Sequence, residues 1–129
     1  MIEFFVAGVP IPQGSKTIAQ AGGKVWLRDA NARDLRAWRD RVAAVARGEV
    51  TEPLEEGVSV KLWFFLPRPK TVKRLLPWVK PDIDKLCRAV NDSLTTAGVW
   101  HDDSQVVELY ASKAYSERPG VLIEIREAS

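Results

Sequence analysis

The sequence contains few of the residues that bind soft metal ions or form cross-links. It has a single cysteine, Cys87, and a single histidine, His101. An intramolecular disulfide, a zinc site built from cysteines and a metal site with several histidines are therefore excluded. Any bound metal ion must be held mainly by carboxylates, which favours hard ions such as Mg²⁺ and Mn²⁺.

Long apolar runs and a strong excess of one charge are also missing. The formal net charge is +2, so the overall charge does not by itself indicate a nucleic-acid-binding protein. No apolar segment approaches the roughly 20 residues that a membrane-spanning helix needs. The N-terminus carries Glu3 and has no basic start, which argues against a signal peptide. We therefore expect a cytoplasmic protein without membrane segments.

What the sequence does contain is the composition and periodicity of one α+β domain. Its 129 residues, 46% hydrophobic and 28% charged, suit a single globular domain over residues 1–129. Apolar patterns predict strands over residues 1–8, 58–66, 106–115 and 121–126, and a hairpin of residues 17–19 and 24–27. Apolar residues three and four apart predict helices over residues 31–47 and 82–96. This order predicts a mixed sheet with two helices packed on it.

Residues 67–81 interrupt this pattern with four prolines and no acidic residue. We expect a long, mobile loop here, since loops of this length in compact domains usually serve a function. From residue 67 to 88, seven basic residues stand against two acidic ones, a local balance of +5. Such a stretch suits an anionic polymer, and Trp78 within it suits stacking on an unpaired base. The alternative is a solvated loop with Trp78 folded onto the core.

Two pairs of aspartates flank the second predicted helix. Asp82 and Asp84 stand at its start, and Asp102 and Asp103 follow its end. Three carboxylates in an apolar frame can hold a divalent cation while leaving positions open for water and a phosphate, as phosphodiester cleavage requires. A helix of this length separates its ends by roughly 20 Å. The two pairs meet only if the following strand carries the second one back, or if the helix is shorter than predicted.

Each of these aspartates also has an ordinary structural interpretation. Asp82 follows a proline and precedes a helix, where an N-cap residue is common. Asp84 suits the positive end of the helix dipole, and Arg88 one turn later is a natural partner for it. Asp102 and Asp103 suit a turn. The spacing alone does not decide between the structural and the metal-binding roles.

Three blocks in the C-terminal half carry a combined pattern: PDIDKL at residues 81–86, NDSLT at 91–95 and VWHDDSQVV at 99–107. In order and spacing they resemble the RusA family of Holliday junction resolvases, which shows a DxDN-L block, a D-(A/S)-L-(T/N) block and a (V/F)-W-x-DD-x-Q-V block. The resemblance covers residues 80–113 well, and PIPQGSK at residues 10–16 agrees with the family in outline.

This resemblance implies a homodimeric, Mg²⁺-dependent endonuclease, with Mn²⁺ able to substitute and no small-molecule cofactor. Its expected substrate is branched DNA, a four-way junction that it resolves by paired symmetric nicks. By the resemblance, Asp82, Asp84 and Asp103 are metal-binding and catalytic. Asp102 is a further metal-site residue that assists or orients its neighbour. Arg88 is a catalytic residue that acts at the phosphate.

Two of these positions depart from the family pattern. Lys85 stands where the family commonly has asparagine, and Arg88 where it usually has lysine, so a cation that can tune its pKa is replaced by one that cannot. His101 occupies a variable position and is expected to be a bystander. The residues expected to contact DNA are Lys16, Arg68, Lys70, Lys73, Arg74, Lys80, Lys85 and Lys113.

Two other functions stay open at the level of the sequence. The departures at Lys85 and Arg88 also suit a DNA-binding module that recognises branches without cutting them. The same acidic and basic residues also suit a metal-dependent nuclease that acts on flaps or simple duplex DNA. Cleavage products in Mg²⁺ or Mn²⁺ separate the first alternative from a resolvase, and a panel of DNA substrates separates the second.

Overall fold

The computed structural model describes residues 1–14, 16–21, 24–29 and 32–128, with the backbone alone for 16–21 and 24–29. Its elements in chain order are β1 (Ile2–Ala7), β2 (Lys16–Ala21), β3 (Lys24–Asp29), α1 (Ala32–Glu49), β4 (Val58–Leu66), α2 (Ile83–Thr96), the short 3₁₀ helix η1 (Asp103–Gln105), β5 (Val106–Tyr115) and β6 (Gly120–Glu127).

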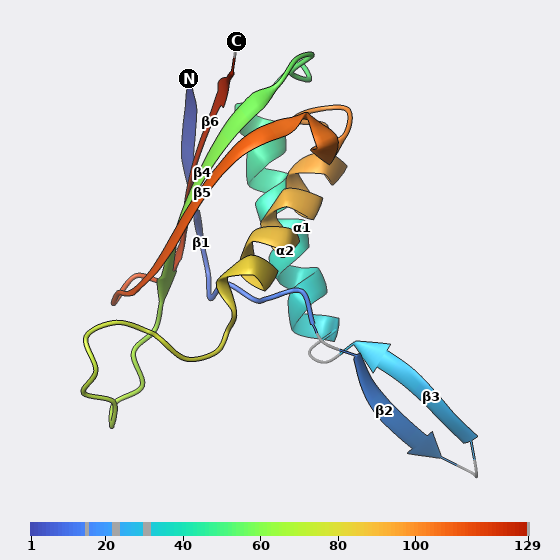
Figure 1. Ribbon diagram of the computed structural model, residues 1–129, viewed down its shortest axis with the longest axis vertical. Helices are drawn as coiled ribbons and strands as arrows, with labels where there is room; N and C mark the ends of the chain where they lie inside the picture. The colour runs from blue at the N-terminus through green and yellow to red at the C-terminus, as the bar shows by residue number, and fades with distance from the viewer. Residues whose placement is uncertain (15, 22–23, 30–31, 129) are drawn as a thin grey trace.

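Four strands form one mixed sheet in the order β1-β6-β4-β5. β5 runs parallel to β4, whereas β6 is antiparallel to both β1 and β4. Both helices lie against the same face of this sheet, and no described element covers its other face (Figure 1). The predicted α+β fold, a mixed sheet with two helices packed on it, is confirmed.

The hydrophobic core lies between this sheet and the two helices. The fully buried residues of the strands are Val6, Val58, Val60, Leu62, Phe64, Val121, Ile123 and Ile125. The helices contribute Leu35, Trp38, Val42, Leu86, Val90 and Leu94. Burying one such side chain stabilises the fold by roughly 1.5–3 kcal/mol relative to leaving it in water. The core therefore holds α2 firmly against the sheet.

Most predicted boundaries agree with the structure to within two residues. The strands predicted over residues 58–66 and 106–115 have those bounds. The second helix begins at Ile83, one residue later than predicted, because Asp82 is its N-cap residue. The hairpin strands β2 and β3 are longer than predicted, and the glycines of its predicted turn, Gly22 and Gly23, lie outside the described residues. No described helix has the length and apolar character needed to span a bilayer.

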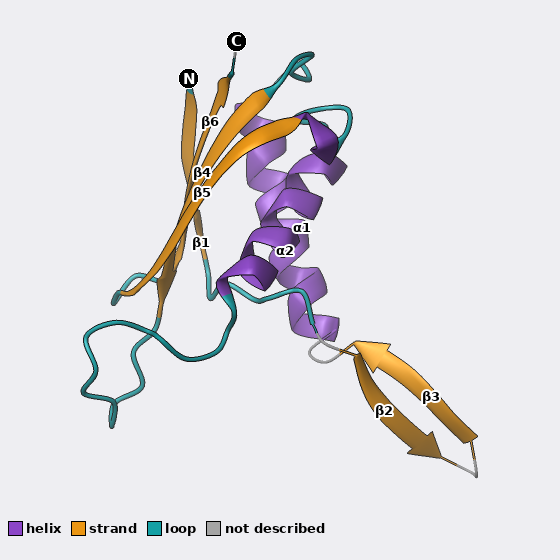
Figure 2. Ribbon diagram, viewed as in Figure 1, coloured by secondary structure: helices purple, strands orange, loops and turns teal. Residues whose placement is uncertain are grey.

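Residues 67–81 contain neither helix nor strand, as predicted, and connect β4 to α2 near the lower end of the sheet in Figure 2. This segment is fastened to the body at the end that meets α2. Lys113 on β5 donates hydrogen bonds from its Nζ to the carbonyl oxygens of Val79 and Pro81, both at 2.7 Å. The mobility of the rest of the loop stays a prediction.

Candidate active site and nucleic-acid interface

The segment that carries Asp103 is anchored to the C-terminal end of α2. Trp100 is 1% exposed, and its Nε1 donates a hydrogen bond to Thr95 Oγ1 at 2.8 Å. Gln105 donates from Nε2 to the carbonyl oxygens of Leu54, at 2.8 Å, and Glu56, at 3.0 Å. The buried ring of Trp100 and the side-chain amide of Gln105, which donates two hydrogen bonds, hold this segment from two sides. They fix the backbone position of Asp103.

Asp102 has the turn role that its sequence context allowed. Its Oδ2 accepts a hydrogen bond from the backbone N–H of Ser104 at 2.9 Å, and it caps η1 in a capping box with Gln105. Hydrogen bonding from Ser104, first through its side chain and then through its backbone, lowers the pKa of Asp102 below its ordinary value. The cap makes Asp103 the first residue of η1, which suits the orienting role expected for Asp102. A direct metal contact from Asp102 stays a prediction.

The two aspartates at the start of α2 do not make the side-chain contacts that their structural interpretations predicted. Asp82 is the N-cap residue, yet its side chain makes no capping hydrogen bond. Its Oδ2 lies 3.7 Å from Lys85 Nζ, so the lysine that departs from the family pattern pairs with a predicted metal-site carboxylate. Asp84 is exposed, and no ion pair joins it to Arg88 among the residues described. Both carboxylates remain accessible.

A cavity of about 440 Å³ lies between α2 and β5, and we call it the α2–β5 groove. Its lining consists of Ile83, Asp84, Cys87, Arg88, Asn91, Asp92, Asp103, Leu109 and Ala111. Three predicted catalytic residues, Asp84, Arg88 and Asp103, are therefore brought to one cavity, whereas Asp82 and Asp102 do not line it.

Two groove residues carry no role in the sequence analysis, although both belong to the NDSLT block. Asn91 and Asp92 follow Asp84 by seven and eight residues, a spacing that places them on the same helix face. This periodicity was the available signal. Asn91 Oδ1 is buried and has no hydrogen-bond partner in the described part of the chain. The groove therefore contains an acceptor oxygen that no described residue satisfies.

The donor chemistry of the groove fits a hard divalent cation. Asp84, Asp92, Asp103 and Asn91 all offer oxygen atoms, the ligands that Mg²⁺ and Mn²⁺ prefer. Burial, and then the negative charge of Asp84, raise the pKa of the Cys87 thiol to about 11, and a sulfur atom is not a ligand that these hard ions prefer. A thiol with that pKa stays protonated at neutral pH, and a protonated thiol binds metals poorly.

In the described part of one chain, however, too few of these ligand residues lie close together to hold such an ion. Among residues 1–14 and 32–128, no group of three or more His, Cys, Asp or Glu side chains is placed to hold a metal ion together. Asp84 lies in the first turn of α2, and Asp92, eight residues on, is about 12 Å further along the helix axis. Asp103 follows the C-terminal end of that helix, where Trp100 anchors its segment.

The direction of β5 explains this separation. β5 begins directly after η1 and runs back along α2, so that Lys113 reaches Pro81 at the start of the helix. The strand returns to Asp82 and Asp84, but Asp103 precedes the strand and stays at the far end (Figure 1). The strand after the second helix was expected to be one way of bringing the two acidic pairs together. Within one chain, β5 does not bring them together. The metal roles of Asp82, Asp84 and Asp103 stay predictions.

Comparison with known proteins gives a consistent result over almost the whole chain. A family model described as Endodeoxyribonuclease RusA matches residues 7–126. The uncharacterized protein YqaN of Bacillus subtilis (strain 168) is 36% identical, over 99% of this chain and 97% of that protein. The crossover junction endodeoxyribonuclease rusA of Lactococcus phage r1t is 30% identical, over 97% of this chain and 95% of that protein.

This chain belongs to the RusA family. A more distant relative, the crossover junction endodeoxyribonuclease RusA of Aquifex aeolicus (strain VF5), is 25% identical over 97% of this chain and 90% of that protein. Family membership identifies the chain as an enzyme, a nuclease that acts on DNA. The resemblance inferred from the three sequence blocks is confirmed, and membership argues against the alternative of a module that does not cut.

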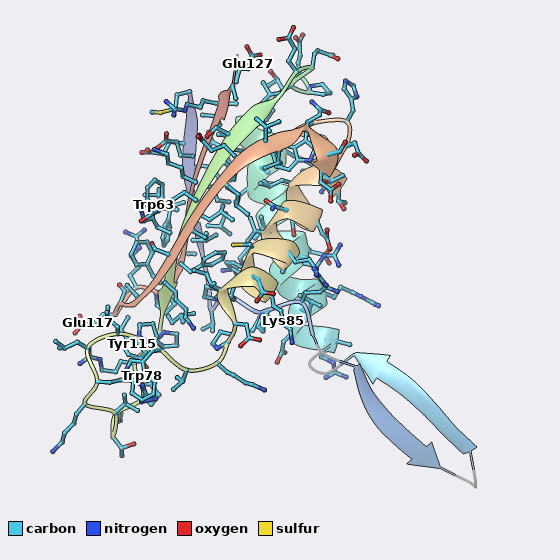
Figure 3. The ribbon with its side chains drawn as sticks, in the orientation of Figure 1. Trp63, Trp78, Lys85, Tyr115, Glu117 and Glu127 are labelled. Carbon is cyan, nitrogen blue, oxygen red and sulfur yellow. The ribbon has the colours of Figure 1, made fainter. Side chains whose placement is uncertain are left out.

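The basic loop of this RusA-family chain presents an exposed aromatic ring. Trp78 is 75% exposed, so the alternative in which it folds onto the core is wrong. The guanidinium of Arg74 lies 5.5 Å from the centroid of the Trp78 ring, and that of Arg68 lies 5.0 Å from the centroid of Tyr115. Figure 3 labels Trp78 on this loop and Tyr115 at the end of β5. Lys70, Lys73 and Lys80 are exposed.

Three other predicted or considered residues have different surroundings. Lys113 uses its Nζ to hold the loop to β5, so any phosphate contact would have to share or break those two hydrogen bonds. The side chain of Lys16 lies outside the described residues. His101 Nε2 lies 2.9 Å from Glu55 Oε2, and His101 does not line the groove. This position suits the bystander role expected for it.

Proposed function

We propose that this chain is a divalent-metal-dependent endonuclease that resolves four-way DNA junctions by paired symmetric nicks. The observation that carries the proposal is that Asp84, Arg88 and Asp103 all line the α2–β5 groove, which lies beside a basic loop with an exposed tryptophan. The printed names of two relatives, crossover junction endodeoxyribonucleases, support four-way junctions as the substrate.

The acidic residues would hold the metal ion, and the cation in the groove would act on the phosphate. Asp82, Asp84 and Asp103 would bind Mg²⁺, or Mn²⁺ in its place, and the ion would supply an activated water and charge neutralisation. Arg88 is exposed in the groove, where its guanidinium would offset charge on the scissile phosphate. Because an arginine practically never loses its proton, Arg88 stabilises charge and does not donate a proton.

The basic loop would hold the DNA next to this groove. Lys70, Lys73 and Lys80 are exposed cations that suit phosphate contacts on the junction arms. Trp78 offers a flat exposed face, which suits stacking on a base exposed where the arms separate. Arg74 packs against that ring and would keep it oriented. Arg68, Lys85 and Lys16 complete the set of proposed DNA contacts.

A homodimer follows from the symmetry of the proposed substrate. A four-way junction has an approximate two-fold axis, and two equivalent cuts need two equivalent active sites. One chain of 129 residues with one α2–β5 groove provides one such site. We therefore propose that two copies act together on one junction.

The proposal predicts a loss of cutting when a groove carboxylate is neutralised. Asp103→Asn should abolish cleavage of a synthetic four-way junction in Mg²⁺ while leaving junction binding intact, because the change removes charge without changing size. Asp34→Asn, which neutralises an exposed aspartate on α1 outside the groove, is the matched control and should cut normally. Full activity of the Asp103→Asn chain would rule out the mechanism. Linear, flap and three-way substrates test the alternative nuclease specificities.

A further inference from the structure

We propose that the groove between α1 and α2 is a second DNA-contact site, in which Arg36, Arg39 and Arg47 bind backbone phosphates of a junction arm. This inference rests on the proposed function and adds a contact surface to the one on the basic loop. The groove has a volume of about 380 Å³ and lies where the two helices run side by side (Figure 1). We call it the α1–α2 groove.

The charged residues of the α1–α2 groove come from one stripe of α1. Arg36, Arg39, Ala43 and Arg47 follow one another at intervals of three or four residues, which places them on one face of the helix. From the first arginine to the last, this row extends about 16 Å along the helix axis. Base pairs of B-DNA are stacked about 3.4 Å apart, so the row runs beside about five of them. Among the described lining residues, three arginines stand against one acid, Asp40.

The three guanidinium groups make no contacts that would explain them as structural residues. No hydrogen bond or ion pair joins Arg36, Arg39 or Arg47 to another described residue. Arg41 on the same helix differs, because its Nη1 donates a hydrogen bond to the carbonyl oxygen of Ala7 at 2.8 Å. A guanidinium carries five N–H donors in a fixed geometry that matches phosphate oxygens. The donors of the three groove arginines therefore remain for a ligand.

The floor of the α1–α2 groove offers a ligand little else to bind. Leu35 and Ala43 are buried apolar residues. Ser93 is also buried, and its hydroxyl already donates to the carbonyl oxygen of Ala89 at 2.8 Å. Arg39 beside them is half-buried, and water and salt screen a partly buried charge less than an exposed one. An anion is therefore the ligand that this groove fits.

Gln13 provides an independent observation at the same groove. Its backbone N–H donates to the carbonyl oxygen of Lys85 at 3.0 Å, which fastens it to the first turn of α2. Its side chain lines the groove, and its Oε1 is buried without a hydrogen-bond partner among the described residues. A water molecule between this oxygen and a bound phosphate would donate one O–H to each. A phosphate in the groove would therefore complete an acceptor that is unsatisfied in the described chain.

The α1–α2 groove and the α2–β5 groove lie on opposite sides of α2. Arg88 lines the second groove, whereas Ser93, turned by about 140° around the helix axis, lines the first. A helix with its side chains is about 10–12 Å across, close to the roughly 12 Å width of the major groove of B-DNA. The two strands of one arm therefore suit the two grooves, with one strand at Arg88 and the complementary strand at the arginine row.

Contacts of this kind would hold an arm without recognising the branch. Phosphate contacts fix the position of a protein on DNA and carry no direct information about the sequence. The arginine row should therefore strengthen the binding of a linear duplex as much as that of a junction. This distinguishes it from Trp78, whose exposed ring suits a base at the point where the arms separate.

The salt dependence of DNA binding tests the arginine row. Asp103→Asn serves as the background chain, so that the DNA stays uncut in Mg²⁺. Each lost phosphate contact lowers the slope of log K against log salt concentration by about 0.9. Arg36→Gln/Arg47→Gln should therefore lower this slope by about 1.8, for a linear duplex and a four-way junction alike, in fluorescence anisotropy. At one fixed salt concentration the affinity should fall roughly tenfold for each arginine.

Two exposed arginines outside the groove provide the matched control. Arg118→Gln/Arg126→Gln lowers the net charge by two, as the groove variant does. An equal loss in this control would assign the effect to overall charge and overturn the proposal, and so would an unchanged slope in the groove variant. Arg36→Lys/Arg47→Lys keeps both charges and should restore the slope. Failure of the lysine variant to do so would assign the loss to altered packing of α1, and the proposal would fall.

Neutral phosphates identify the strand that each groove holds. A methylphosphonate replaces one backbone phosphate of a duplex arm at a time. A position bound by the row should weaken binding of the background chain but not of Arg36→Gln/Arg47→Gln, and positions coupled in this way to Arg88→Gln should lie on the other strand. Coupling of both variants to the same strand would overturn the placement across α2. None of these measurements requires cutting, so a parent chain that passes them yet cuts no junction would overturn the proposed function alone.

Discussion

Two tryptophans show how differently the regions at the two ends of α2 are built. Trp100 is 1% exposed and fastens the Asp103 segment to α2, whereas Trp78 is 75% exposed and stands on the basic loop. Several hydrogen bonds within the chain hold the first region, so the backbone at Asp103 has one defined position. The second region keeps a ring and several cations at the surface, where they can adapt to DNA.

Substituting Trp100 should have the largest effect on the folded state. Trp100→Ala removes a fully buried ring and its hydrogen bond to Thr95, and a buried tryptophan replaced by alanine typically costs about 3–5 kcal/mol. We expect the free energy of unfolding, measured in urea, to fall by that amount. An unchanged stability would show that this segment does not depend on the ring.

The same substitution at Trp78 should leave the stability almost unchanged and weaken the binding of DNA. Trp78→Ala removes an exposed ring, so the free energy of unfolding should change by less than about 0.5 kcal/mol. Loss of one stacked base should weaken junction binding by about 1–3 kcal/mol. Fluorescence anisotropy with a labelled junction and a linear duplex measures this, and the loss should be larger for the junction. Equal losses on both substrates would contradict a contact at the branch.

The sequence predicts best those features that depend on the pattern of side chains within one strand or helix. The strands over residues 58–66 and 106–115 were predicted with their bounds, because both segments are rich in β-branched, aromatic and other apolar residues and are flanked by turn-forming residues. Helical periodicity likewise identified the buried stripe of α2. These are local signals, since each depends on side chains a few residues apart.

What the sequence left open depends on how elements pack against one another. Trp78 has the same composition signal whether it folds inward or outward, and only the structure shows it exposed. The distance between Asp84 and Asp103 depends on where β5 turns back along α2, which no spacing encodes. Lys113 was predicted to contact DNA, yet its Nζ donates hydrogen bonds to two loop carbonyl oxygens that come from another part of the chain.

An intermediate effect is expected from the amide that fastens the anchored region. Gln105→Glu keeps the acceptor oxygen for His101 and Asp102 but removes both donors to Leu54 and Glu56. Leaving these carbonyl oxygens unpaired typically costs about 1–3 kcal/mol. We expect stability to fall by this amount and Mn²⁺ affinity to fall with it, because Asp103 loses its fixed position. A loss of stability without a change in Mn²⁺ affinity would separate the anchor from the site.

The smallest expected effect belongs to the cap at Asp102, and it is a dependence on pH. Hydrogen bonding from Ser104 lowers the pKa of Asp102 below its ordinary value of 3.8. A carboxyl with a lowered pKa in the folded state contributes stability that is complete above the ordinary value and is lost as the pH falls through the lowered one. The asparagine in an Asp102→Asn chain keeps an acceptor oxygen for Ser104 but does not titrate.

The parent chain should therefore be slightly more stable than the variant at pH 6, and this advantage should shrink below pH 3.8. Unfolding curves of both chains at a series of pH values measure the difference directly, and a difference that does not vary with pH would show that the charge of Asp102 contributes nothing to its cap.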